Sequence, residues 1–257
     1  MKRLAPALIA LALLAVPWAA SSQEGPAHAP DYRAQKLIAP LDFPPKPDAP
    51  FTAIARTTWV QILPDGSTVT YQNERVVARD MDGRIFQERR TFIPVPGDGK
   101  QQSLVRMVDY TDPLEHTFYR CNPYGKVCNL FPYYEPVTEP LRPAGLQPDG
   151  MSYLTRENLG TDTFEGIDVQ RSRETFTFYK QSVGNTSTIL RTVDYWYSPA
   201  LGINVKVVRH DPRDGDQTLW LSDISESVAD PQYFKVHAGY RIVDHRAVAA
   251  QPGESER

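Results

Sequence analysis

From Phe51 to Val243 the sequence alternates runs rich in Val, Ile, Thr and aromatic residues with turns built from Gly, Pro and Asp. Such runs suit a pleated sheet surface, and the turn residues end them. The turns at Asp65-Gly66 and Asp82-Gly83 separate three runs between Phe51 and Ile93, which predicts an antiparallel meander. We therefore expect an all-β domain with very little helix, made of about ten antiparallel strands in one twisted, partly closed sheet.

The last third of the chain carries most of this pattern. A glycine-containing segment, Asn158 to Ile167, is expected to be a turn between strands. Asp230-Pro231 offers a helix cap followed by proline, which predicts one helical turn that places Phe234 on the sheet. The proline-rich stretch Pro132 to Gly150 is expected to be a long connector between the two halves of the sheet. The strands expected after it are Ile167 to Tyr179, Thr188 to Tyr197, Ile203 to Arg209 and Gln217 to Ser225.

The N-terminus has the pattern of an export signal. A basic start, Met1-Lys2-Arg3, precedes the apolar run Leu4 to Val16, and small residues follow up to Ser22. A membrane anchor is the alternative, but this run is shorter than the roughly 20 residues that a spanning helix needs. We expect a signal peptide at residues 1–22 and a mature protein that does not span a membrane and is periplasmic or secreted.

The remaining organisation follows from composition. Residues 23–50 form a proline-rich leader, residues 51–243 a single β domain, and residues 244–257 a disordered tail. Hydrophobic residues make up 41% and aromatic residues 11% of the chain, which is typical of globular proteins. The formal net charge of −3 argues against nucleic acid as a partner.

The chain has two cysteines, Cys121 and Cys128, on either side of a turn sequence. A hairpin with a four-residue loop, Pro123 to Lys126, would place them opposite each other. A three-residue loop would shift the register by one and put the two sulfurs on opposite faces. The export signal favours a structural disulfide. The alternatives are a metal site, for which the spacing does not fit, and a redox pair, which usually has two intervening residues.

Chemistry-bearing motifs are sparse. The five histidines show no metal-site spacing, and we find no nucleophile elbow, phosphate-binding glycine loop or His-Glu-x-x-His. We therefore predict no cofactor, no metal and no enzymatic activity. Large aromatic residues on separate strands remain as candidate ligand-binding residues on a concave face, with an ordinary core as the alternative. These candidates are Trp59, Phe176, Phe178, Trp196 and Trp220.

Several short segments together carry a family resemblance. They are Arg79 to Arg84, Glu157 to Thr161, Tyr195 to Pro199, Asp211 to Arg213, and Asp230 to Phe234. The chain resembles a family of uncharacterised exported bacterial proteins of the acidobacteria type. Its C-terminal part is similar to the outer-membrane lipoprotein carrier superfamily. That resemblance implies a curved antiparallel half-barrel that holds acyl chains or other apolar ligands on its concave side. Unlike the carriers, this chain shows no amphipathic helix pattern near its mature N-terminus.

Three functions are consistent with these observations. The first is an exported binding or carrier module for a hydrophobic ligand, such as a lipid or an acylated protein. The alternative is a structural or protein-interaction module of the cell envelope with no small ligand. An enzyme ranks last, because no nucleophile, base and orienting group can be assembled from the sequence.

Overall fold

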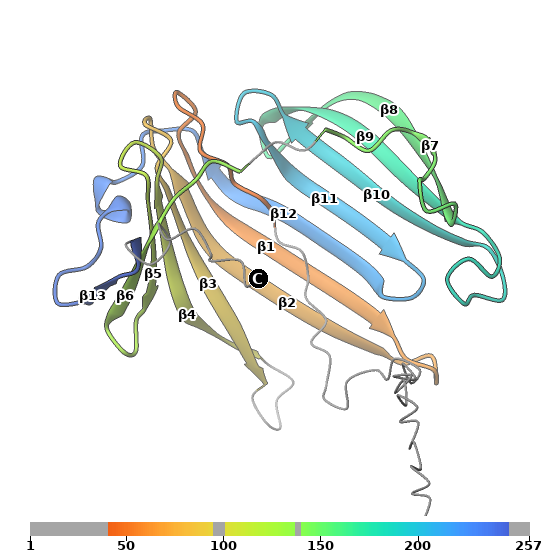
Figure 1. Ribbon diagram of the computed structural model, residues 1–257, viewed down its shortest axis with the longest axis horizontal. Helices are drawn as coiled ribbons and strands as arrows, with labels where there is room; N and C mark the ends of the chain where they lie inside the picture. Colours follow the sequence, from red (N-terminus) through yellow and green to blue (C-terminus); the bar gives the residue numbers. More distant parts are fainter. Residues whose placement is uncertain (1–40, 95–100, 137–139, 247–257) are drawn as a thin grey trace, which may run out of the picture. The chain divides into compact units, whose positions relative to one another are not determined.

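The computed structural model describes residues 41–94, 101–136 and 140–246. The expected signal peptide, most of the expected leader and the end of the expected tail lie outside these residues. The described residues form one open, curved sheet of 13 strands, and the only helical element among them is the short 3-10 turn η1, Pro231–Phe234 (Figure 1). The all-β prediction is confirmed, whereas the prediction of about ten strands is too low.

The sheet consists of two halves that each follow the chain in order. Its strands are β1 (Phe51–Ile62), β2 (Thr68–Arg79), β3 (Ile85–Pro94), β4 (Gln101–Asp112), β5 (Thr117–Asn122), β6 (Val127–Pro132), β7 (Gly145–Leu146), β8 (Ser152–Phe164), β9 (Ile167–Phe178), β10 (Ile189–Ser198), β11 (Ile203–Asp211), β12 (Gly215–Ser225) and β13 (Arg241–Asp244). The order across the sheet is β13-β6-β5-β4-β3-β2-β1-β12-β11-β10-β9-β8-β7. The pairing of β1 with β12 joins the two halves, and β13 is the strand that runs parallel to its neighbour.

Strand β8 is the main difference from the expected strands. Asn158 to Ile167 was expected to be a turn, but Ser152–Phe164 is a continuous strand, and the turn lies at Glu165-Gly166. Gly160 has a φ of +83° and lies where the register between β8 and β9 shifts. Gly160 therefore forms a bulge inside the strand. Glycine at positive φ is common in β-bulges as well as in turns.

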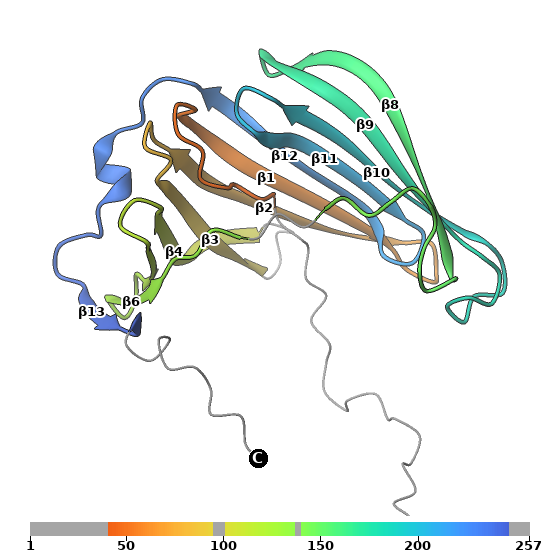
Figure 2. The same ribbon diagram turned by 45° about the horizontal axis from the view of Figure 1, so that its top comes forward.

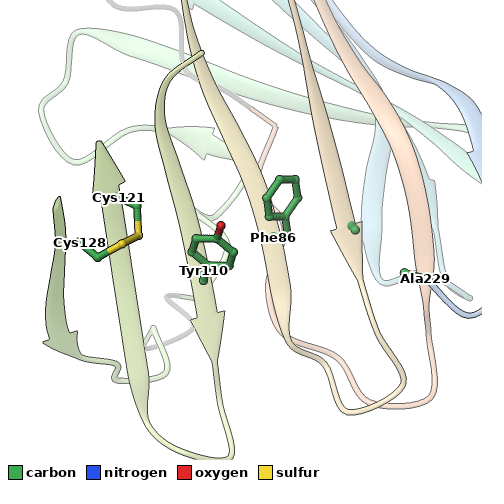
Figure 3. Packing of buried hydrophobic residues seen from close by; sticks show 6 residues of the cluster. Phe86, Tyr110, Cys121, Cys128 and Ala229 are labelled. Carbon is green, nitrogen blue, oxygen red and sulfur yellow. A yellow bond between two sulfur atoms is a disulfide. The ribbon is translucent and has the colours of Figure 1, made fainter. Parts of the chain in front are cut away.

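The hairpin of β5 and β6 has the register predicted for the four-residue loop. Cys121 pairs directly with Cys128, and the two form a disulfide. Phe86 and Tyr110 lie on the same side of the sheet as the disulfide, as Figure 3 shows. Together with the two cysteines and Ala229 they form a buried hydrophobic cluster. The 3-10 turn η1 packs on this cluster: the ring centroids of Tyr233 and Phe86 are 5.0 Å apart.

The helical turn itself is confirmed. Asp230 Oδ1 accepts a hydrogen bond from the backbone N–H of Gln232 at 2.9 Å, which is the capping contact that the Asp-Pro sequence predicts. The Arg84 guanidinium lies over the Phe234 ring at 5.6 Å, so Phe234 does contact the sheet.

The other side of the sheet is crossed by the segment Leu41–Pro50, which we call the strap. Figure 2 shows the strap and the described parts of the connector, residues 133–136 and 140–151, running across the concave side of the sheet, whereas the chain between β12 and β13 passes outside it. We call the concave side the inner face and the opposite side the outer face.

The strap, which was expected to be the end of the leader, packs against the inner face. Leu41, Phe43 and Ala49 are buried in it. Its prolines have no N–H to offer a sheet edge, so it cannot form a regular strand. Its carbonyl groups bond to basic side chains instead. Arg79 of β2 donates to the strap carbonyls of Ala49 and Pro44 at 2.8 and 2.9 Å, and also to the Leu201 carbonyl between β10 and β11 at 2.5 Å.

Candidate functional site

The inner face changes from aliphatic to charged along the strands. Its aliphatic part is buried and is formed by side chains of four neighbouring strands, namely Ala53, Val77, Val205, Val207, Leu219 and Leu221. The strand pairings place the following arginines on this same face: Arg75, Arg79, Arg89, Arg120, Arg156, Arg191 and Arg209. The carboxylates that the strands place near them are Asp109, Glu174 and Asp211. Arginines therefore outnumber carboxylates on this face.

Asp109 of β4 anchors the charged group on one side of the face. Its side chain is 1% exposed and accepts hydrogen bonds from Arg89 Nε at 2.9 Å and from Arg120 Nε and Nη2 at 2.9 and 3.0 Å. Arg75 lies beneath the strap, where it donates to the Leu41 carbonyl at 3.2 Å. Burial first, and then the charge of Arg89, lower the pKa of Arg75 to about 10.

Glu174 of β9 anchors the second charged group, on strands β8 to β11. It accepts a hydrogen bond from Arg156 Nε at 2.6 Å and one from the Tyr195 hydroxyl at 3.2 Å. Burial and the Glu174 carboxylate raise the pKa of Tyr195 to about 12. Arg209 lies nearby, and burial lowers its pKa, with a further contribution from the charge of Arg191.

Two further arginines of this second group lie over aromatic rings. Arg191 lies over Phe176 with 5.2 Å between its Cζ and the ring centroid, and Arg213 lies over Phe178 at 4.6 Å. Arg213 also forms a two-point ion pair with Asp211, with N–O distances of 2.9 and 2.6 Å. That pair lowers the pKa of Asp211. A stacked guanidinium keeps its in-plane N–H groups available for oxygen acceptors.

The structure places three of the five aromatic residues predicted from the sequence on the same face of the sheet. Trp59, Phe176 and Phe178 lie on the inner face. Trp59 is buried, stacks on Tyr71 with ring centroids 5.2 Å apart, and donates from its indole N–H to the Asp214 carbonyl.

The other two predicted residues, Trp196 and Trp220, lie on the outer face. Trp220 pairs across the strands with Arg56 and Lys206, and Lys206 pairs with Trp196, so all four share that face. The Lys206 ammonium lies 4.6 Å from the centroid of the Trp196 ring. The five residues thus do not form one surface, because alternate residues of a strand point to opposite faces.

The strand patterns did not single out the inner-face arginines, although they contain a signal for them. Arg209 has the same parity in β11 as Ile203, Val205 and Val207, and Arg191 has the same parity in β10 as Val193. Extending the aliphatic alternation by one step would have placed both arginines next to the apolar surface.

The described residues were also compared with the requirements of a metal site, a charged cavity and a membrane-spanning helix. Within residues 41–94, 101–136 and 140–246, no group of three or more His, Cys, Asp or Glu residues could hold a metal ion. A cavity of about 430 Å³ lies between the ends of β3 to β5 and the C-terminal segment, and its Arg84 and Arg246 pair with neighbouring aspartates. No helix in the described part of the chain has the length and apolar character to cross a membrane.

Comparison with known proteins gives structural similarity only. No family model and no curated protein matches the chain. An uncharacterized conserved protein from Thermus thermophilus is similar, with 8% identity over 77% of this chain and 91% of that chain and a TM-score of 0.39. A LolA superfamily protein from Nitrosomonas europaea has 10% identity over 74% of this chain and 92% of that chain, with a TM-score of 0.25.

The lipoprotein LppX from Mycobacterium tuberculosis is also similar, with 17% identity over 71% of this chain and 88% of that chain and a TM-score of 0.26. The matched structures thus include a protein of the LolA superfamily and a lipoprotein. Because all three TM-scores are below 0.5, the function proposed below rests on the contacts within this chain.

Proposed function

We propose that this protein is an exported binding module that holds a lipid-like ligand, such as a lipid or the acyl group of a modified protein, on the inner face of its sheet. The observation that carries the proposal is that the sheet has no second layer among the described residues. A sheet with an apolar face normally buries that face against helices or another sheet. Here the described chain places only the strap and the connector segments 133–136 and 140–151 on the inner side.

The strap covers the inner face with irregular chain rather than with a helix or a second sheet. Lys46 ties it to the far half of the sheet by donating to the carbonyls of Pro199 and Ala200 at 2.8 and 2.7 Å. These two bonds are exposed to water, where hydrogen bonds contribute little net stability. The part of the strap around Lys46 can therefore shift to admit an apolar chain at a lower free-energy cost than a packed helix would need, while Arg79 holds the Pro44 and Ala49 carbonyls on either side of it.

An apolar dye tests the proposal. N-phenyl-1-naphthylamine, which is neutral, fluoresces strongly only when it leaves water. We expect the mature protein to raise its fluorescence with saturable binding. Tyr71→Glu places a charge on the inner face beside Trp59, where Tyr71 is 43% exposed, and should weaken binding at least about tenfold because a charge resists burial with an apolar ligand.

Gln72→Glu is the matched control. Gln72 is the next residue of the same strand, is exposed, and points to the outer face. The Gln72→Glu variant should bind the dye with an affinity within about twofold of that of the wild type. Absence of saturable binding, or equal losses for the two variants with both still folded, would count against an inner-face ligand and favour an envelope interaction module without a small ligand.

A further inference from the structure

The cavity of about 430 Å³ on the outer face has a floor from the sheet and a cover from the end of the chain. In the floor, Tyr110 of β4 pairs with Tyr119 of β5, and Asp112 pairs with Thr117. Tyr110 lies on the same side of the sheet as the disulfide (Figure 3), and the strand alternation places the other three residues on that side too. The cover is formed by the side chains of Phe234, Lys235, Val236, Ile242 and Arg246.

Three hydroxyl groups of this floor have free hydrogen-bonding capacity. Tyr110 and Thr117 are only 6% and 7% exposed. Neither of their hydroxyls, nor that of Tyr119, forms a hydrogen bond with another residue in the described part of the chain. Buried hydroxyls are normally paired. Burial, and then the nearby Tyr240, raise the pKa of Tyr110 to about 12, so this phenol stays protonated and can donate at neutral pH.

The charged groups around the cavity do not favour an anion. Arg84 is held by Asp80, and Arg246 is held by Asp244, each with an N–O distance of 2.6 Å. The other charged side chains of the lining are one lysine and two carboxylates, namely Lys235, Asp112 and Glu115. The lining and its paired aspartates thus carry no excess of positive charge. What the cavity offers to a ligand is mainly its neutral hydroxyl groups.

We propose that this cavity binds a neutral sugar, a mono- or disaccharide, through the hydroxyls of Tyr110, Thr117 and Tyr119. Sugar hydroxyls both donate and accept, so they can pair with all three groups, whereas an ammonium ligand only donates and leaves the O–H donors without an acceptor. Val236 and Ile242 supply apolar surface for the C–H groups of the ring. The volume lies near the lower end of the roughly 300–1,000 Å³ typical of small-ligand sites. This site lies on the opposite face from the proposed lipid site and is independent of it.

An NMR titration of the ¹⁵N-labelled mature protein tests the assignment. The sugar probes are methyl β-glucoside, N-acetylglucosamine and lactose, and tetramethylammonium chloride is the cationic comparison. We expect at least one sugar to cause saturable shifts of the Thr117, Lys235 and Val236 amide signals, which report on the floor and the cover. Tetramethylammonium should leave these three signals unchanged.

Single-hydroxyl variants locate the sugar. Tyr119→Phe, Tyr110→Phe and Thr117→Val each remove one hydroxyl and nearly keep the side-chain shape. Each should weaken binding of the responding sugar about fivefold, as expected for one neutral hydrogen bond. Tyr233→Phe is the matched control, because Tyr233 packs on Phe86 at the same face but does not line the cavity. The control should bind the sugar within about twofold of wild type.

Each outcome decides for or against the sugar site. Absence of saturable shifts with all three sugars overturns the proposal, and shifts with tetramethylammonium alone indicate a cation site instead. Equal losses for Tyr119→Phe and Tyr233→Phe, with native amide spectra for both, would place the sugar outside this cavity. Should Thr117→Val or Tyr110→Phe fail to fold, the comparison of Tyr119→Phe with Tyr233→Phe still decides. Dye binding at the inner face is a separate readout that none of these outcomes affects.

Discussion

Arg79 is the residue that should hold the strap on the inner face. Its side chain is fully buried, donates to three backbone carbonyls, and stacks on Phe51 with 5.0 Å between its Cζ and the ring centroid. Burial alone lowers the pKa of Arg79 to about 10. Folding removes water from this cation, and the three hydrogen bonds to carbonyls compensate for the lost hydration. Arg79→Met keeps the volume and removes all three donors.

The expected loss is large. A hydrogen bond that involves a charged group contributes roughly 1.5–3 kcal/mol net. Three such bonds sum to at least about 4.5 kcal/mol. Because Met restores apolar contact in the same space, we expect the free energy of unfolding to fall by somewhat less than this sum, about 3–4 kcal/mol. For a domain of this size each kcal/mol shifts Tm by about 2–4 °C, which gives a decrease of about 6–16 °C.

Urea unfolding and hydrogen exchange measure the two parts of this prediction. The Asp48 amide donates to the Met81 carbonyl at 2.9 Å, so its exchange should accelerate when the strap loosens. Arg56→Met is the control, because the Arg56 side chain is 35% exposed on the outer face, and it should cost at most about 1 kcal/mol. A Tm shift of Arg79→Met no larger than that of the control, with unchanged Asp48 protection, would refute the anchoring role.

Three further changes test other parts of the structure. Replacing Cys121 and Cys128 by serine should cost about 2.5 kcal/mol in urea unfolding, the loop-entropy value for so short a loop; stability equal to that of the oxidised wild type would show that the bridge constrains little. Gly215→Ala should cost more than about 3 kcal/mol, because its φ is +89° and a Cβ there would lie 2.1 Å from a facing backbone oxygen. Gly66→Ala, at φ +81° with open space around it, should cost only about 1–2 kcal/mol, and equal losses for the two glycines would contradict the close approach. The pKa of Tyr195 is about 12, above its unfolded value, so its contribution to stability is complete below pH 10 and is lost as the pH rises towards 12. Tyr195→Phe should therefore flatten the fall of stability between pH 10 and 12, and an unchanged profile would argue against that ionisation.

The features that were predicted correctly depend on local contacts between residues close together in the sequence. The Cys121–Cys128 hairpin and the turn capped by Asp230 depend on residues close together in sequence, where loop length and capping chemistry leave few alternatives. Strand β8 was missed because Gly160, which fits a turn and a bulge equally well, was assigned to a turn.

The strand order and the face on which each aromatic residue lies depend on pairings between residues far apart in the chain, which the sequence did not predict. The pairing of β1 with β12 joins residues such as Trp59 and Gln217, which are far apart in the chain. Parity within one strand says which residues share a face, but not which face of that strand aligns with the inner face of its neighbours. For this reason Trp196 and Trp220 were grouped with Phe176, although they lie on the opposite side.

Native mass spectrometry of the mature protein, purified without detergent from cells that export it, tests the central claim most directly. The account predicts a stoichiometric adduct of lipid size that organic extraction removes. A bare polypeptide mass, with no adduct even after incubation with an extract of its own envelope lipids, would contradict a lipid-binding inner face.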